Sequence, residues 1–189
     1  MIRIGILGKI GSGKSYVAKK FGYPVFNADL EVGKIYKKNK KIFNKLKKVI
    51  PNYISSFPIN KNQLSKAILA NKSNLKKIIK IVHFEVRKQM VLFLKKNKNK
   101  KIVILDIPLL LENKINNKKD ILVYVDSKST DILKRIKKRD NFNPQLLKKF
   151  EKIQLPYNYK KKKSQFIIKN NFTYESVQKS IKNILKKII

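Results

Sequence analysis

Short apolar runs alternate along the chain with longer segments whose apolar residues recur every three or four positions. Strands are predicted at five of the runs, near residues 2–7, 24–26, 101–105, 121–125 and 166–168. Helices are predicted at 15–20, 30–49, 62–70, 73–96, 129–139, 144–154 and 174–188. Two of the runs are continuously apolar, which is typical of parallel strands covered on both faces. The alternation predicts an α/β fold, a three-layer sandwich around a five-stranded parallel sheet.

One long segment interrupts this alternation. Residues 30–99 contain no predicted strand, so we expect a helical insertion there. Such an insertion is a place where a substrate would bind. The single domain expected of 189 residues then divides into a core, an insertion and a small lid. The core takes residues 1–29, 100–135 and 164–189, the insertion 30–99, and the lid 136–163. Within the lid, the lysine run 160–163 is interpreted as a solvated loop.

The loop after the first predicted strand carries the clearest chemical signal. Its sequence, Gly8-Lys9-Ile10-Gly11-Ser12-Gly13-Lys14-Ser15, fits G-x-x-x-x-G-K-[ST], the phosphate-binding loop of the P-loop NTPases. The residues predicted to bind phosphate oxygens through backbone N–H groups are Gly8, Gly11, Ser12 and Gly13. Lys14 is predicted to reach the β- and γ-phosphates of ATP, and the Ser15 hydroxyl to bind Mg²⁺.

Carboxylates follow two other predicted strands. Asp29 follows the second strand and Asp106 ends the third. Ligands of open α/β sheets bind at the carboxyl ends of the strands, so both carboxylates are expected near the phosphate loop. Asp29 is predicted to be the catalytic base that accepts the proton of the acceptor hydroxyl, and Asp106 to lie on the Mg²⁺ side. The sequence leaves open which of the two is the base.

Two arginines stand out in a chain that otherwise uses lysine. Arg135 and Arg139 are four residues apart and are predicted to share one helical face. A guanidinium binds phosphate oxygens in a bidentate fork, so both residues are predicted to bind the nucleotide from the lid, with Arg139 acting in catalysis. The only histidine, His83, fits a structural role and a substrate contact equally well.

The formal charge of +36 suggests nucleic-acid binding, but its composition argues otherwise. Only four of the 47 basic residues are arginine, tryptophan is absent, and the lysines are spread along the whole chain. Lys, Asn and Ile are enriched together, as an A+T-rich coding bias produces. We therefore expect no specific nucleic-acid partner, although weak and salt-sensitive binding to polyanions is expected. No stretch is apolar enough for a membrane span, no cysteine is present, and a cytoplasmic monomer is predicted.

Taken together, these segments resemble the dephospho-coenzyme A kinases nearly from end to end. The matching segments are Gly8–Ser15, Asn27-Ala28-Asp29, His83-Phe84-Glu85-Val86-Arg87, Asp106-Ile107-Pro108-Leu109-Leu110-Leu111-Glu112, Arg135–Arg139, Gln154 and Phe166–Asn170. The phosphate loop is shared by many enzymes. The Asp-x-Pro-Leu-Leu-x-Glu segment, in order with the others, is the specific signal.

The resemblance implies ATP-dependent phosphorylation of the ribose 3′-hydroxyl of dephospho-coenzyme A on a nucleoside-monophosphate-kinase-like fold. The residues that it assigns to the acceptor are Asp29, His83, Arg87, Pro108, Leu109, Leu110 and Glu112. It places Asn170 near the adenine of ATP and Tyr16 beside the phosphate loop. The chain departs from the family at Tyr16, where Thr is usual, at Asn27, where Asp is usual, and at Phe172, where Gly is common.

Three other functions stay open from the sequence. One is another small-molecule or nucleoside-monophosphate kinase on the same scaffold, since the insertion decides which acceptor is bound. The second is a nucleic-acid-associated ATPase, which the positive charge suggests. The third is a nucleotide-binding module without catalytic activity.

Overall fold

The computed structural model describes residues 1–140 and 142–189. The strands are β1 (Ile2–Gly8), β2 (Val25–Asn27), β3 (Ile102–Asp106), β4 (Ile121–Asp126) and β5 (Phe166–Lys169). The helices are α1 (Lys14–Lys20), α2 (Ala28–Lys38), α3 (Lys40–Val49), α4 (Lys61–Ala70), α5 (Lys72–Lys96), α6 (Ser129–Lys137), α7 (Pro144–Lys152), α8 (Tyr157–Lys163) and α9 (Tyr174–Ile188).

Within the described residues, the five strands form one parallel sheet in the order β2-β3-β1-β4-β5. The predicted α/β fold with a five-stranded parallel sheet is therefore confirmed. β1 is central, so its carboxyl end, with the phosphate loop, is flanked by the ends of β3 and β4. On the other side of β3, Asn27 at the end of β2 pairs with Asp106.

The chain forms two compact units. The first holds the sheet and comprises residues 1–27, 96–143 and 150–189; the second comprises 28–95 and 144–149. The second unit thus contains nearly all of the predicted insertion, together with a short piece of the predicted lid. The division into core, insertion and lid stays a prediction, and residue 141 of the predicted lid lies outside the described residues.

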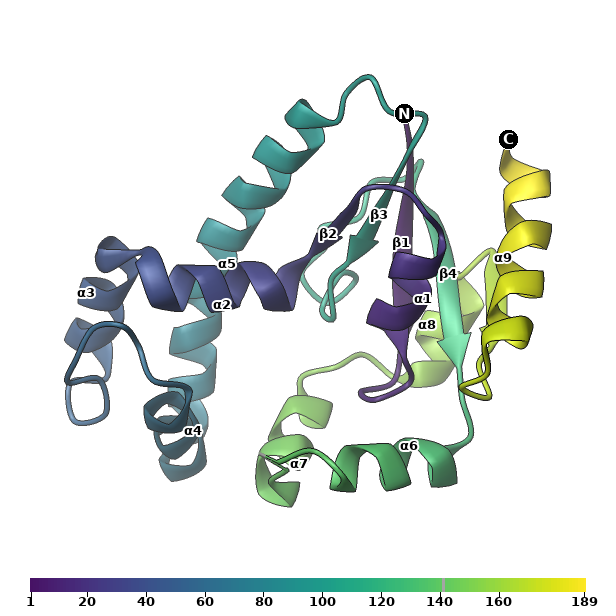
Figure 1. Cartoon of the computed structure of the whole chain (residues 1–189). Helices are drawn as coiled ribbons and strands as arrows, with labels where there is room; N and C mark the ends of the chain where they lie inside the picture. The colour runs from purple at the N-terminus through teal and green to yellow at the C-terminus, as the bar shows by residue number, and fades with distance from the viewer. Residues whose placement is uncertain (141) are drawn as a thin grey trace. The chain divides into compact units, whose positions relative to one another are not determined.

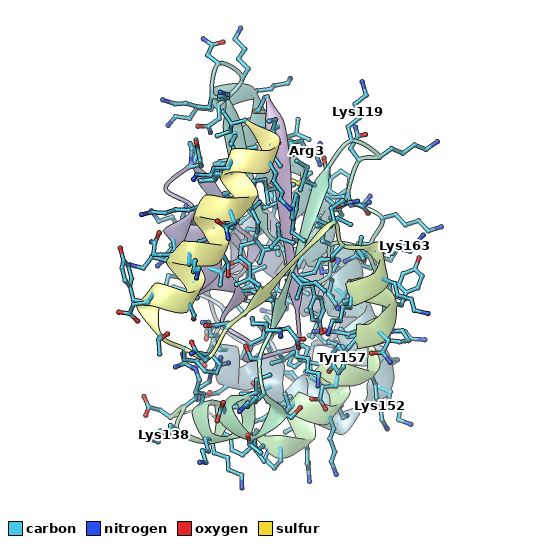
Figure 2. The ribbon with its side chains drawn as sticks, turned by 90° about the vertical axis from the view of Figure 1, so that its right-hand side faces the viewer. Arg3, Lys119, Lys138, Lys152, Tyr157 and Lys163 are labelled. Carbon is cyan, nitrogen blue, oxygen red and sulfur yellow. The ribbon has the colours of Figure 1, made fainter. Side chains whose placement is uncertain are left out.

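Helices cover both faces of the sheet in the first unit. On one face, α1 and α9 pack on apolar side chains of the strands, including Ile4, Ile6 and Val123. On the other face, α8 packs against β1 and β4. Figure 1 shows α1 and α9 beside the strands, and Figure 2, turned by a quarter, shows α9 and α8 on opposite sides of the sheet. Helices on both faces of the sheet explain why β3 and β4 are built on continuously apolar runs.

Three predicted elements differ from the structure. The helix predicted over 30–49 is interrupted at Asn39, whose extended backbone caps α3 while its side chain accepts the Ile42 N–H at 3.0 Å. α6 ends at Lys137, so the prediction that Arg135 and Arg139 share one helical face is wrong. Arg139 lies in the turn beyond, where its N–H bonds the Ile136 carbonyl instead of continuing the helix.

The third difference is the lysine run 160–163, which is helix α8 and not a loop. Pro156 precedes its first residue and suits a helix start, since proline needs no N–H partner there. Lys160 is 1% exposed, so the prediction of a solvated segment is wrong for this residue.

Arg3, which has no evident task in the sequence, is half-buried and forms an ion pair with the buried Asp120 at the amino end of the sheet. Its guanidinium lies 2.9 Å from the Asp120 carboxylate, which also accepts the Asn117 N–H at 2.8 Å. Arg3 lies towards one end of the sheet in Figure 2, and Tyr157 of α8 towards the other. Burial raises the pKa of the Asp120 carboxyl, while the Asn117 N–H and Arg3 act in the opposite direction. Desolvation therefore outweighs the attraction.

We expect Arg3→Met to destabilise the fold by about 3–5 kcal/mol near neutral pH, because it leaves a buried carboxylate without its cation. Burial raises the pKa of Asp120 in the folded protein above its value in the unfolded chain. The contribution of Asp120 to the free energy of unfolding is therefore complete below the unfolded pKa and is lost as the pH rises through the folded pKa. Removing Arg3 raises the folded pKa further, so the destabilisation should grow from acidic to neutral pH. Urea unfolding at several pH values measures it.

The exposed pair Lys34–Glu31, 2.7 Å apart on α2, provides the control. Lys34→Met should change the free energy of unfolding by less than about 1 kcal/mol at every pH, because exposed pairs contribute little. A loss for Arg3→Met that is the same at acidic and neutral pH would contradict the assignment to Asp120.

Candidate active site

The phosphate loop between β1 and α1 is built on glycines with positive φ angles. Gly11 and Gly13 have φ of 84° and 90°, in the left-handed region that favours glycine. Gly13 is the N-cap of α1, so the first N–H groups of the helix follow the loop directly. At Gly8, a Cβ would meet the Ser12 hydroxyl and the Val125 carbonyl at 2.7 Å. The loop therefore has the backbone form that phosphate binding requires, and the binding itself stays a prediction.

The side chain of Lys14 folds back into this loop. Its ammonium donates to the carbonyl of Lys9 at 2.8 Å and to that of Gly8 at 3.2 Å. A cation is thus held at the place where a phosphate-binding loop needs one. The next residue, Ser15, is exposed in the first turn of α1, and Tyr16 follows it at 39% exposure.

Two side chains brace the loop from outside. The Ser127 hydroxyl, just after β4, donates to the Ser12 carbonyl at 3.0 Å. The Asn170 amide, just after β5, donates to the same carbonyl at 2.9 Å and accepts the Phe172 N–H through its oxygen. Asn170 is 2% exposed, and its own N–H bonds the Asp126 carbonyl at 2.7 Å. Asn170 therefore fixes the loop, and its predicted proximity to adenine stays a prediction.

Gly13→Ala should raise KM for ATP at least about tenfold, because a Cβ there meets the Asn170 amide and requires a left-handed backbone. The Asn170–Ser12 hydrogen bond would then break and the loop would shift. Steady-state kinetics with varied ATP measures the effect. Gly33→Ala, in α2 with nothing within 4 Å of the added methyl, is the matched control and should leave KM unchanged. Equal values for both variants would contradict this account of the loop.

Helix α6 places Arg135 beside the loop. A Cβ on Gly11 would lie 2.7 Å from the Ile136 side chain, so α6 packs directly on the phosphate loop. The Arg135 guanidinium lies 4.3 Å from the centre of the Phe172 ring. Phe172 has a φ of 66°, in the left-handed region that favours glycine. The structure thus brings Arg135 to the loop, while Arg139 is exposed in the turn after α6.

The carboxylate of Asp106 is buried at the end of β3. It is 2% exposed and accepts a hydrogen bond from the Asn27 amide of the neighbouring strand β2. An amide donor here holds the carboxylate in one orientation and adds no second negative charge. Asn27 therefore supports Asp106 where a second carboxylate would repel it.

The segment predicted to face the acceptor follows Asp106. Pro108 and Leu109 are half-buried, whereas Leu110 is fully buried, and a Cβ on Gly5 of β1 would lie 2.5 Å from its side chain. Glu112 pairs with Lys160 of α8 at 2.6 Å and accepts the Leu155 N–H at 3.0 Å. Leu110 and Glu112 thus anchor the segment, and the predicted contacts of Pro108, Leu109, Leu110 and Glu112 with the acceptor stay predictions.

The remaining predicted acceptor residues belong to the second unit. Asp29 is exposed in the first turn of α2, where the helix N-terminus favours a carboxylate. His83 is half-buried and Arg87 is exposed, one turn apart on α5. The assignment of all three to the acceptor stays a prediction.

The site suits Mg²⁺ bound together with a nucleotide. Among the described residues, no group of three or more His, Asp or Glu side chains could hold a metal alone. Mg²⁺ is usually bound by one or two protein oxygens together with substrate phosphates, and the oxygens of Ser15 and Asp106 are of that kind. The donor set fits the ion.

Three supporting residues are not predicted from the sequence, namely Ser127, Asp126 and Lys160. Asp126 pairs with Lys161 at 2.8 Å, and Lys160 with Glu112. A polar residue at the end of a buried strand or directly after it is a signal for Asp126 and Ser127, because such positions lie at the carboxyl edge of the sheet. In a chain with this many lysines, nothing in the sequence distinguishes Lys160.

Comparison with known proteins agrees with this geometry. A family model described as dephospho-CoA kinase matches residues 2–176. A dephospho-CoA kinase of Wolbachia sp. subsp. Brugia malayi is 34% identical over 187 residues, which cover 96% of this chain and 95% of the relative. One of Fusobacterium nucleatum is 32% identical, with 98% and 97% covered.

Solved structures share the fold. A Thermus thermophilus protein of known crystal structure superposes with a TM-score of 0.78 at 26% identity, covering 100% of this chain and 98% of that one. A dephospho-CoA kinase from Campylobacter jejuni has a TM-score of 0.63 at 22% identity, with 98% and 96% covered. The similarity to the Campylobacter jejuni structure, at 22% identity, shows the fold alone. The family model and the curated relatives also show the family. The chain belongs to the dephospho-CoA kinase family.

Proposed function

We propose that this protein transfers the γ-phosphate of ATP to the ribose 3′-hydroxyl of dephospho-coenzyme A, forming coenzyme A and ADP. The observation that carries the proposal is the Lys14 ammonium inside a glycine-built phosphate loop, in a chain of this family. The family fixes the reaction class, a phosphoryl transfer to an alcohol.

The chain supplies positioning and charge for this reaction. The loop N–H groups and the N-terminus of α1 bind phosphate oxygens, and Lys14 neutralises charge on the β- and γ-phosphates. The acceptor oxygen forms a bond to the γ-phosphorus while the bond to the β,γ-bridging oxygen breaks and ADP leaves. Asp29 takes the proton of the acceptor hydroxyl. Mg²⁺, held by Ser15 with Asp106 on its side, would supply further positive charge to the phosphates.

The lid arginines act on the same phosphates in this proposal. Arg135 lies beside the loop through the packing of α6, and its guanidinium on the Phe172 ring offers a flat surface to a nucleotide. Arg139, in the turn beyond α6, is proposed to reach the transferred phosphate. We further propose that the protein acts as a cytoplasmic monomer. Among the described helices, none combines the length and the apolar character that crossing a bilayer requires.

Acceptor-dependent ADP formation tests the proposal. Dephospho-coenzyme A is compared with AMP, CMP, adenosine and shikimate. Shikimate is included because a shikimate kinase of low sequence identity shares the fold of this chain. We expect dephospho-coenzyme A to stimulate ADP formation at least about a hundredfold over each of the others. Preference for another acceptor would keep the kinase scaffold and overturn the substrate.

A further inference from the structure

A buried cluster of charged and polar groups joins α8 to the segment after β3. The Lys160 ammonium lies 2.6 Å from the Glu112 carboxylate and donates to the Gln154 side-chain oxygen at 2.9 Å. The same Glu112 oxygen accepts the Leu155 N–H at 3.0 Å. The side chains of Lys160 and Glu112 are 1% and 9% exposed, and Lys160 is among the largest fully buried side chains described. All of these residues belong to the first unit.

Burial on this scale is costly for two charges. Removing an ion pair from water costs several kcal/mol for each ion, and a pair of hydrophobic side chains of similar volume is often as stable. The second carboxylate oxygen of Glu112 has no hydrogen-bond partner among the described residues, which adds to the cost. Stability alone therefore gives a weak reason for such a pair, and the geometry that the pair enforces gives a stronger one.

The cluster fixes one end of the segment that begins at Asp106. Leu110 is locked against Gly5 of β1, and its carbonyl accepts the Ile115 N–H at 3.0 Å. Two residues further, the carboxylate of Glu112 is held by the α8 cluster. Pro108 and Leu109 lie between these anchors and the end of β3, so their position depends on both. α8 itself is seated on β1 and β4, which makes it a rigid support.

We propose that Lys160 is a positioning residue for the acceptor, acting through Glu112 on Pro108 and Leu109. Its ammonium sets the place of the Glu112 carboxylate, which sets the course of the segment that meets dephospho-coenzyme A. The effect is on the acceptor side, because the two groups that bond to the Lys160–Glu112 pair, the Gln154 side-chain oxygen and the Leu155 N–H, lie outside the phosphate loop. The inference rests on the proposed function for the identity of the acceptor.

The double variant Glu112→Gln with Lys160→Met tests the proposal. It removes both charges together, keeps both side-chain sizes, and leaves an oxygen for the Leu155 N–H, so no unpaired charge is buried. We expect a folded protein whose KM for dephospho-coenzyme A rises at least about tenfold while KM for ATP changes less than about twofold. Lys162→Met, an exposed lysine of the same helix, is the control and should change neither constant.

A second measurement does not depend on the acceptor. Amide hydrogen exchange should accelerate in residues 107–115 of the double variant and stay unchanged in the phosphate loop, residues 8–15. The single variant Glu112→Gln is measured in the same two ways, and its KM for dephospho-coenzyme A is expected to rise about threefold or more. This single variant tests the proposal even if the double variant does not fold.

Two results would overturn the proposal. The first is wild-type KM for dephospho-coenzyme A with wild-type exchange in residues 107–115, since the pair would then serve the fold only. The second is an equal rise of both KM values, which would indicate a general loss of structure. If the wild-type protein itself does not phosphorylate dephospho-coenzyme A, the proposed function fails, and the exchange comparison still decides whether Lys160 fixes the segment.

Discussion

Lys14→Met should lower kcat/KM for phosphoryl transfer by about a thousandfold, while the protein stays folded. Methionine matches the length of lysine and removes its charge. The ammonium of Lys14 lies within the loop, on the carbonyls of Gly8 and Lys9, where it can move onto the phosphates when ATP binds. Charge at that position matters most when negative charge develops on the bridging oxygen, so kcat should fall more than KM rises.

The control for Lys14 is Lys19→Met, an exposed lysine in the last turn of the same helix α1. It removes one charge from the protein and should leave kcat/KM within about twofold, because exposed charges are screened by salt. Steady-state kinetics with both substrates, together with thermal unfolding, measures the pair of variants. A Lys14→Met enzyme with wild-type kcat would show that the phosphate loop does not carry the reaction.

Asp29→Asn should lower kcat by about a hundredfold to ten-thousandfold, the range typical of a lost general base. Binding of ATP should be unchanged, since asparagine keeps the size of the side chain and Asp29 is not part of the phosphate loop. The assignment of the base to Asp29 is part of the proposal, and the two carboxylates differ in their surroundings. Asp29 is exposed at the start of α2, where a hydroxyl can reach it, whereas the Asp106 carboxylate is buried and hydrogen-bonded to Asn27.

Asp106→Asn, measured beside Asp29→Asn, separates the two carboxylates. We expect the Asp106 variant to need more Mg²⁺ for half-maximal activity, because it loses a hard anionic oxygen on the metal side. If Asp106→Asn abolishes turnover at saturating Mg²⁺ while Asp29→Asn turns over normally and binds ATP normally, the base is Asp106 and the assignment made here is wrong.

The sheet and the phosphate loop are predictable because their signals are local. Strands buried on both faces need continuous apolar runs, and a phosphate loop needs glycines at fixed spacing between a strand and a helix. The position of Asp106 near the phosphate loop can be predicted in the same way, because Asp106 ends an apolar strand that pairs with β1.

Most features that the sequence does not predict depend on partners far along the chain, and one depends on a local cap. Lys160 reads as solvated in a lysine run and is buried because Glu112 and Gln154 pair with it. Asn170 fits an adenine contact by family resemblance, and only the fold shows its amide on the Ser12 carbonyl. The break at Asn39 is a local capping effect that the lysine-rich helical pattern conceals.

The most direct test of the central claim follows the γ-phosphate itself. ATP labelled in the γ-phosphate is mixed with the protein, Mg²⁺ and dephospho-coenzyme A, and the products are separated. We predict that the label appears in coenzyme A as a 3′-phosphate, and that Lys14→Met abolishes the transfer. Label released as inorganic phosphate without any in coenzyme A, with a rate that rises when RNA or DNA is added, would contradict the claim and indicate a nucleic-acid-associated ATPase.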